Sequence, residues 1–402
     1  MTYKTAGRHT TPFRFASPCE ATIPEHSGAR GSALAFTLLV LVVASALVAV
    51  AWTVVFSEAR IDDTAAALHR SFYVAEGGAL ATIRNWSRSY NFIAPYPTDS
   101  VAIPSDFPAS WLNLQHGNAA YGGYLYRLNE ELYLLRTVGR GDRSPFPAFH
   151  ELGTLLRLEP PRSVARAALE AGGSVQVDGP VRISGIDSAP PGWSCSPRDS
   201  SQAGIAAESI AILSPPGARI TGQPPMAITA PEAEPARLRS WTALRDVLVT
   251  EPNHTLPGSS LPTIQPSVVG GHCAVAVTTN WGDATHPTAP CGAFYPVTHL
   301  TGDAVLGDVA GQGTLLVDGD LTLTGAVRWN GIILTGSNLT LKSSGPAIQI
   351  WGAMVAFGTV SVAADTLASS LEVTYSKCAI TKALEAAASV VPLASRSSIE
   401  PF

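Results

Sequence analysis

Charged residues are scarce in this sequence. Asp, Glu, Lys and Arg make up only 14% of its 402 residues, and the net charge is −5. Such a chain has no bulk positive field that would attract nucleic acid, and we expect no nucleic-acid partner. The low charge, together with 46% apolar residues, indicates that part of the chain faces something other than water.

Motifs of several enzyme classes are missing as well. The sequence has no Gly-x-Ser-x-Gly nucleophile elbow and no Cys-x-x-Cys pair of a zinc ribbon or a thioredoxin. Its glycine-rich stretch 307–317 is not followed by the Gly-Lys-Ser/Thr that a phosphate-binding loop needs. We therefore expect no catalytic residues, no enzyme activity and no cofactor.

Two groups of residues could suggest a metal site, but neither fits one. Histidines and cysteines gather around one loop with spacings unlike those of zinc fingers: His272, Cys273, His286 and Cys291. Asp318 and Asp320 flank a glycine, yet two carboxylates are too few for a calcium shell, and Asp-Gly is ordinary turn sequence. We expect no bound metal.

Four of the five cysteines follow a long apolar run. These four are Cys195, Cys273, Cys291 and Cys378, and they could form two disulfides if this part of the chain is exported. Cys273 and Cys291 bracket one loop rich in Gly and Pro, which favours them as a pair. The sequence alone leaves the connectivity open.

The apolar run covers residues 33–56, which include no charge and no proline. At about 1.5 Å per residue, a helix of this length exceeds the ~30 Å hydrocarbon core of a bilayer. A secretory signal peptide has a shorter apolar core, of about 7–15 residues. The run therefore predicts a transmembrane helix over residues 32–56.

The charges on either side of the run predict its orientation. The preceding segment is basic and the following one begins mainly acidic: Lys4, Arg8, Arg14 and Arg30, then Glu58, Arg60, Asp62 and Asp63. Because the positive side stays in the cytoplasm, we expect a cytoplasmic leader over residues 1–31 and an exported remainder.

The helical pattern continues beyond the apolar run, over residues 57–90. Apolar side chains recur there at spacings of three and four: Ile61, Ala65, Leu68, Phe72, Ala75 and Ala79. We predict one helix that runs from the bilayer into solvent and packs its upper half on a domain. Within the membrane, small side chains would let neighbouring helices approach closely: Ala44, Ser45, Ala46, Ala49 and Ala51.

Three short motifs lie before and after the apolar run: Arg30-Gly31-Ser32-Ala33-Leu34, SEARIDD (57–63) and SFYVAEGGAL (71–80). Together with the apolar run, they resemble the N-terminal region of PilX-type type IV pilus assembly proteins. The resemblance implies a pilin-like protein whose leader a prepilin peptidase cuts between Gly31 and Ser32. It also implies partners among pilin-like subunits and pilus assembly proteins at a bacterial inner membrane. One position departs from the pattern, because Phe36 stands where major pilins carry a glutamate.

Residues 91–165 predict a small antiparallel sheet, as in pilin-like heads. After an irregular, proline-rich connection over 91–116, apolar and aromatic residues cluster in 123–128, 132–139 and 149–160. The intervening Asn129-Glu130-Glu131 suits a hairpin turn.

Residues 166–402 predict a parallel β-helix or solenoid. Short β-branched strands broken by glycine return at intervals of about 20 residues, and aligning them on glycine matches Gly179, Gly319, Gly336 and Gly358. The alternation places Leu315, Val317, Leu321 and Leu323 inward, with Ile332, Leu334, Leu339 and Leu341 stacked over them. Residues 186–300 then form a Pro- and Gly-rich insertion with one helix at 236–249. A β-sandwich is the alternative fold.

Three segments of this half resemble the exported regions of large PilX-like proteins: Gly172 to Gly179, Trp281-Gly282-Asp283 and Gly311 to Leu321. The sequence thus predicts a non-enzymatic, membrane-anchored, pilin-like protein whose exported head decorates or caps a filament or mediates adhesion. The alternatives are a membrane-tethered β-solenoid adhesin that never enters a filament, and a tethered hydrolase.

Overall fold

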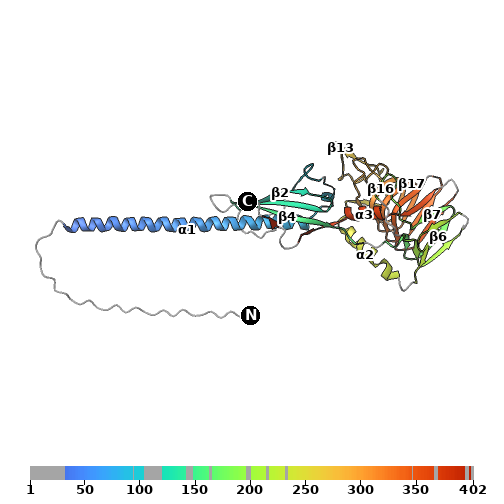
Figure 1. Ribbon diagram of the computed structural model, residues 1–402, viewed down its shortest axis with the longest axis horizontal. Helices are drawn as coiled ribbons and strands as arrows, with labels where there is room; N and C mark the ends of the chain where they lie inside the picture. Colours follow the sequence, from blue (N-terminus) through green and yellow to red (C-terminus); the bar gives the residue numbers. More distant parts are fainter. Residues whose placement is uncertain are drawn as a thin grey trace. The chain divides into compact units, whose positions relative to one another are not determined.

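A computed structural model of the chain describes residues 32–93, 95–103, 120–141, 148–162, 165–195, 201–213, 217–230, 234–345, 347–365, 370–393 and 398–399. The chain divides into two units, one ending at Asp63 and the other beginning at Thr64. Figure 1 shows a long helix α1, a small sheet that includes β2 and β4, and a larger β domain that includes β6, β7, β16 and β17.

Helix α1 (Ser32–Arg84) is continuous, which confirms the prediction of one long helix. In the second unit its small side chains are buried: Ala67, Ser71, Ala75, Ala79 and Thr82. Gly78 allows this close packing, because a Cβ there would lie 2.5 Å from the ring of Tyr121. The helix ends at Arg84 rather than at residue 90, because Trp86 turns into the core and the chain enters the 3₁₀ helix η1 (Arg88–Phe92).

The small sheet is antiparallel, as predicted, with the order β1-β2-β3-β4-β22 and with β23 also paired to β4. The strands are β1 (Val101–Ile103), β2 (Ala120–Arg127), β3 (Leu132–Gly141), β4 (Ala148–Glu159), β22 (Ser389–Pro392) and β23 (Ser398–Ile399). The predicted hairpin turn is confirmed, since the Asn129 side chain accepts the amides of Glu131 and Leu132. The sequence gives no sign that the last two strands come from the chain's C-terminal end. The larger domain is therefore inserted between two strands of this sheet.

Helix α1 packs on one face of the small sheet almost backbone to backbone. A Cβ on Gly139 of β3 would lie 2.1 Å from the carbonyl oxygen of Ser71. Nearby, the Thr137 hydroxyl donates a 3.0 Å hydrogen bond to the carbonyl of Ala75. This face buries a core of large side chains: Leu125, Tyr133, Leu135, Leu152 and Leu156.

The larger domain is a parallel β-solenoid of fifteen strands, so the β-sandwich alternative is wrong. Its strands are β5 (Ala167–Ala171), β6 (Ser174–Asp178), β7 (Val181–Ser184), β8 (Ala203–Ala207), β9 (Ser209–Ile212), β10 (Arg219–Thr221), β11 (Met226–Ile228), β12 (His254–Pro257), β15 (Val297–Thr301), β16 (Ala304–Val317), β17 (Leu321–Thr335), β18 (Leu339–Ser343), β19 (Ile348–Ala356), β20 (Val360–Ala364) and β21 (Leu371–Tyr375). A hairpin of β13 (Val268–Val269) and β14 (His272–Cys273) and the helices α2 (Glu234–Thr250) and α3 (Lys377–Ala386) complete the domain.

The coils do not stack in the order of the sequence. Strands β5, β6 and β7 lie on β19, β20 and β21, although they come first in the chain. Strands β8 to β11 extend this end, and the chain then passes through α2 to the opposite end, where β12 pairs with β15. The segment 186–300 is therefore not a plain insertion, because it supplies the outermost strands at both ends of the solenoid.

The predicted stacking of inward residues is correct on one side of each coil and one residue off on another. Leu321 pairs with Leu339, and Leu323 pairs with Leu341. Leu315, however, lies opposite Ile333, so Ile332 and Leu334 stack on Thr314 and Leu316 instead. All of the predicted inward residues are buried, because both faces of this side of the solenoid are covered.

The register error comes from the glycines chosen for alignment. The amide of Ser337, not that of Gly336, donates to the carbonyl of Gly319, and Gly358 donates to Ser337. The next member of this column is Gly173, whereas Gly179 lies one corner further along its coil, between β6 and β7. Glycine alone does not distinguish these corners.

Side-chain oxygens join the coils at the corner that follows Gly319. The Asp303 carboxylate accepts the amide of Asp320 at 2.8 Å, Asp320 accepts the amide of Asn338 at 2.9 Å, and Asn338 accepts the amide of Thr359 at 3.0 Å. Each oxygen satisfies a backbone donor that this turn of the coil would otherwise leave to solvent. We call Asp303, Asp320, Asn338 and Thr359 the corner ladder.

Candidate functional site

The apolar part of α1 is the first candidate functional surface. Among the described helices, α1 alone is long and apolar enough to cross a membrane, and its most apolar stretch is entirely exposed. Its hydroxyl groups bond back to the helix, because Thr37, Ser45 and Thr53 each donate to the carbonyl three residues earlier. The surface of this stretch is therefore apolar all round, as contact with lipid requires. Of the predicted processing residues, Gly31 lies outside the described residues, and α1 begins at Ser32.

The five small residues of this stretch are exposed but do not share one side of the helix. At 3.6 residues per turn, Ala44 and Ala51 lie on one side, and Ser45, Ala46 and Ala49 lie on roughly the opposite side. Helix packing through these residues stays a prediction.

Two disulfides lie in the second unit, Cys273–Cys291 and Cys195–Cys378. The first closes the loop that the sequence favours, and the second ties α3 to the segment after β7. All four cysteines follow the apolar part of α1, and disulfides persist in oxidising compartments outside the cytosol.

The loop closed by Cys273–Cys291 places Trp281 in the end of the solenoid core. The Trp281 ring is fully buried and packs edge to face on Trp329, with 6.1 Å between ring centroids. Trp329 in turn lies opposite Gly311 on the neighbouring strand, where a Cβ would lie 2.5 Å from the indole. Gly311 therefore leaves the space that the two indoles fill. The Trp-Gly-Asp segment thus fills the end of the core, and its signal in the sequence is Gly311, the glycine opposite Trp329.

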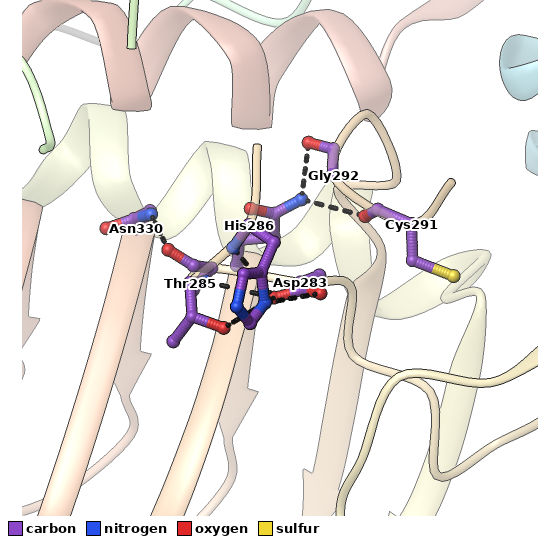
Figure 2. A network of polar contacts seen from close by, with 8 residues as sticks. Asp283, Thr285, His286, Cys291, Gly292 and Asn330 are labelled. Carbon is purple, nitrogen blue, oxygen red and sulfur yellow. Dashed lines mark hydrogen bonds and ion pairs between the residues drawn. The ribbon is translucent and has the colours of Figure 1, made fainter. Parts of the chain in front are cut away.

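Asp283 closes the turn that follows Trp281 (Figure 2). Its carboxylate accepts the amides of Thr285 and His286 and the Thr285 hydroxyl, the last at 2.7 Å. Burial by itself would raise the pKa of Asp283, but the hydrogen bonds from Thr285 and His286 outweigh it and lower that pKa. The carboxylate therefore serves the backbone of its own loop.

Two buried amides fasten this loop to the flank of the solenoid. The Gln312 side chain donates to the carbonyls of Cys291, Gly292 and Phe294, at 2.9 to 3.2 Å. The Asn330 side chain donates to the carbonyl of Ala284 at 3.2 Å, a contact visible in Figure 2. Gln312 and Asn330 lie opposite each other on adjacent strands, so consecutive coils hold one loop. Neither residue was predicted from the sequence, in which both stand directly before a glycine.

Five of the six residues considered as metal ligands have other contacts here. Both cysteines of the first group are bonded to each other, and the ring of His286 contacts Asp283. A carboxylate oxygen of Asp318 lies 3.0 Å from Nε2 of His299, whereas Asp320 belongs to the corner ladder. Within the described residues, no three His, Cys, Asp or Glu side chains gather as a metal site would require.

A buried arginine joins the small sheet to the solenoid. Arg88 of η1 donates to the carbonyls of Val247, Leu248 and Glu251 at the C-terminal end of α2. Cations are favourable there because the last carbonyls of a helix have no partners within it. Burial lowers the pKa of Arg88, and the nearby Glu251 partly offsets this.

Two further residues of η1 contact other parts of the solenoid domain. The Asn91 amide donates to the carbonyls of Ala386 and Ala388 at the end of α3, at 3.0 and 2.9 Å. The Phe92 ring packs edge to face on Phe294, with 4.8 Å between centroids. The segment Arg88–Phe92, predicted as an irregular connection from residue 91, is therefore a clasp between the two β domains.

A cavity of about 490 Å³ lies beside this clasp. Aromatic and apolar side chains from η1 and from the disulfide loop line it, including Tyr90, Phe92 and Phe294, with Asp99 and His272 among its polar groups. Its size is within the range of small-molecule sites, but none of its polar groups is nine-tenths buried.

Fold and site together define a protein with one long apolar helix and a β-solenoid head, whose polar clusters serve its own backbone. No protein-family model matches the chain, and no curated protein matches it. Among solved structures, a match is the competence-associated pilin ComZ from Thermus thermophilus, with 10% identity and a TM-score of 0.21. The alignment covers 82% of this chain and 96% of that one. A TM-score this low supports no inference about fold or function.

Proposed function

We propose that this chain is a non-enzymatic, pilin-like component of a type IV pilus or a related secretion machine, anchored in a bacterial inner membrane. The observation that carries the proposal is the contrast along α1. Residues 33–56 are exposed throughout and apolar all round, whereas the helix from Thr64 onward contributes to a folded head. The same helix is therefore both the proposed anchor and the first element of the head.

The disulfides support export of the head. Both bonds lie after the apolar stretch, and the cytosol would keep such thiols reduced. The basic residues before the stretch favour the same orientation, with the N-terminus inside.

Assembly is the proposed mechanism. In the membrane the apolar helix would pack laterally against helices of other pilin-like subunits, by van der Waals contact between small side chains. The polar groups of the head, such as Asp283 and Gln312, are used in holding its own loops, which supports a role without catalysis.

N-terminal sequencing of the mature protein from membranes tests this proposal. Processing by a prepilin peptidase predicts a start at Ser32. Gly31→Val should abolish processing, whereas Gly28→Val, three residues earlier, should leave it intact. An uncut Met1, or a cut inside the apolar stretch near Ala51, would contradict the pilin-like role.

Phe36 favours one alternative, since major pilins carry a glutamate at that position. In this alternative, the chain is a membrane-tethered β-solenoid adhesin that never enters a filament. Crosslinking in cells separates the two: a cysteine at Ala44 or Ala49 should crosslink to pilin-like subunits only if the helix enters a filament.

A further inference from the structure

The two faces of the small sheet differ in what they present. On the face that meets α1, Leu125 and Tyr133 are fully buried. Because side chains alternate along a strand, Tyr124 and Tyr126 of β2 point to the opposite face. Tyr124 is 49% exposed there, and its neighbour on β1 is the small, exposed Ala102. The outer face therefore presents aromatic rings to solvent.

Exposed aromatic rings of the head gather at this outer face. Among the described residues after Asp63, the exposed Phe, Tyr and Trp side chains are Tyr73, Tyr96, Tyr124 and Phe149. Tyr124 and Phe149 both lie on the outer face, and Tyr96 contacts it through Tyr126. Single exposed apolar residues are normal, whereas a group of them marks an interaction surface.

Three tyrosines form one cluster on this face. The rings of Tyr96 and Tyr126 meet edge to face, with 5.6 Å between centroids. The ring of Tyr124 lies 6.3 Å from that of Tyr126, and the two planes differ by 36°. We call Tyr96, Tyr124 and Tyr126 the tyrosine platform.

The backbone fixes Tyr96 beside β2. Its amide donates a 2.7 Å hydrogen bond to the carbonyl of Arg127. The Arg127 guanidinium in turn donates to the carbonyls of Ile93, Asn129 and Glu130, each at 3.1 Å. The platform is therefore held in place before a ligand arrives, and binding does not have to order it.

The charges beside the platform are already paired. Arg136, which lies opposite Tyr124 on β3, donates through Nε and Nη2 to the Glu151 carboxylate and also hydrogen-bonds with the Tyr126 hydroxyl. An anionic ligand would have to break this pair to gain a counter-charge there. Hydrogen-bonding capacity of both kinds is present, because carboxylate oxygens have several lone pairs and a tyrosine hydroxyl can donate or accept.

We propose that the tyrosine platform binds a neutral polysaccharide built of pyranose rings. One face of such a ring carries C–H groups, which pack on an aromatic ring, while its hydroxyl groups both donate and accept hydrogen bonds. The exposed rings of Tyr96 and Tyr124 serve the first contact, and the groups around the Arg136–Glu151 pair serve the second. The centre of a protein–protein interface is instead depleted of charged side chains, whereas this ion pair lies beside the rings. The inference does not rest on the proposed function, because it concerns the head alone.

Isothermal titration calorimetry of the full chain tests this proposal, in micelles of a detergent without a sugar headgroup. The neutral probes are cellohexaose, mannohexaose and the hexamer of N-acetylglucosamine, and the acidic probe is the hexamer of galacturonic acid. At least one neutral probe should bind with a Kd below about 1 mM, and the acidic probe should bind about tenfold more weakly. Failure of every neutral probe to reach this Kd, or equal binding of the acidic probe, would overturn the proposal.

Substitutions then locate the binding surface. Tyr124→Ala should weaken binding of the neutral probe about tenfold or more, whereas Tyr124→Phe keeps the ring and should lose much less. Phe149→Ala is the matched control, because it removes another exposed ring of the same face, at a different position along the sheet, and should leave binding unchanged. Equal weakening by the two alanine variants would also overturn the proposal, while leaving the membrane anchor untouched.

A further variant tests the preference for a neutral chain. Glu151→Gln leaves the Arg136 charge without its partner and should raise the affinity for the acidic probe. An unchanged affinity for that probe would contradict the role given to the ion pair in selecting neutral chains.

Discussion

The two stretches of helix α1 have opposite environments within one continuous element. In the first, Leu47 is 65% exposed and its neighbours on every side of the helix are apolar. In the second, Val74 and Ala75 are fully buried, while Tyr73 and Leu80 on other sides stay exposed. A membrane anchor and a core element can thus both be helical. What distinguishes them is how apolar side chains are distributed around the helix axis: on all sides in the first stretch, and mainly on one side in the second.

The largest expected effect is the loss of membrane insertion when charges are placed in the first stretch, residues 33–56. Replacing both Val43 and Leu47 by arginine should prevent stable membrane insertion, since each arginine near the centre of a bilayer costs about 3 kcal/mol. The matched control is Tyr73→Arg with Leu80→Arg, which places the same charges on exposed sites of the second stretch. Carbonate extraction of membranes measures the outcome. If both double variants remain equally membrane-bound, residues 33–56 are not the anchor.

The next effect tests how closely the second stretch packs. Gly139→Ala should lower the stability of the head by about 3 kcal/mol, because the new Cβ would overlap the backbone of α1 at Ser71 and Ala75. Gly122→Ala, on the neighbouring strand, adds a Cβ with nothing within 4 Å and should be nearly neutral. Chemical unfolding of the full chain in micelles, followed by tryptophan fluorescence, compares the two variants. Equal stabilities would mean that helix and sheet do not pack this closely.

The same contrast explains what the sequence could and could not reveal. The spacing of apolar residues was sufficient to predict α1, the antiparallel strands and the parallel solenoid, because each has a repeating apolar pattern. Coil order was not predictable, since nothing in β5 shows that it lies on β19 rather than beside its neighbours in sequence. The predicted register was wrong by one residue because Gly336 and Ser337 are equally suited to a turn.

The candidate site was harder to predict than the fold. A Cys–Cys pair around one loop was visible, but the clasp residues Arg88 and Asn91 bind backbone carbonyls more than 150 positions away. Carbonyl acceptors have no sequence signature, since every residue has one. Polar residues that bind distant backbone therefore look like ordinary loop residues until the fold brings the two together.

A smaller expected effect is the pH dependence of stability caused by His254, which lies on β12 at one end of the solenoid. Burial lowers the pKa of His254 below its ordinary value of 6.5, and hydrogen bonding with Asn280 and Asn253 partly offsets this. The unfolded chain therefore binds a proton more readily than the folded head, and stability should fall as the pH drops below about 6.5. Thermal unfolding between pH 8 and pH 5 measures this slope. His254→Leu should reduce the slope, and a slope unchanged by this substitution would exclude His254 as its source.

The smallest effect tests whether the corner ladder holds coils together, as the packed apolar columns do. Asp320→Ala removes the oxygen that accepts the amide of Asn338, and should cost about 1 kcal/mol, the usual net value of one hydrogen bond. Asp320→Asn keeps an oxygen in the same place and should recover most of that loss. Since the ladder is exposed while the columns are buried, its contribution should stay well below that of Gly139→Ala, measured by the same unfolding experiment. If Asp320→Asn is as unstable as Asp320→Ala, the negative charge rather than the hydrogen bond matters at this corner, and the repeated Asp and Asn residues would need an electrostatic explanation.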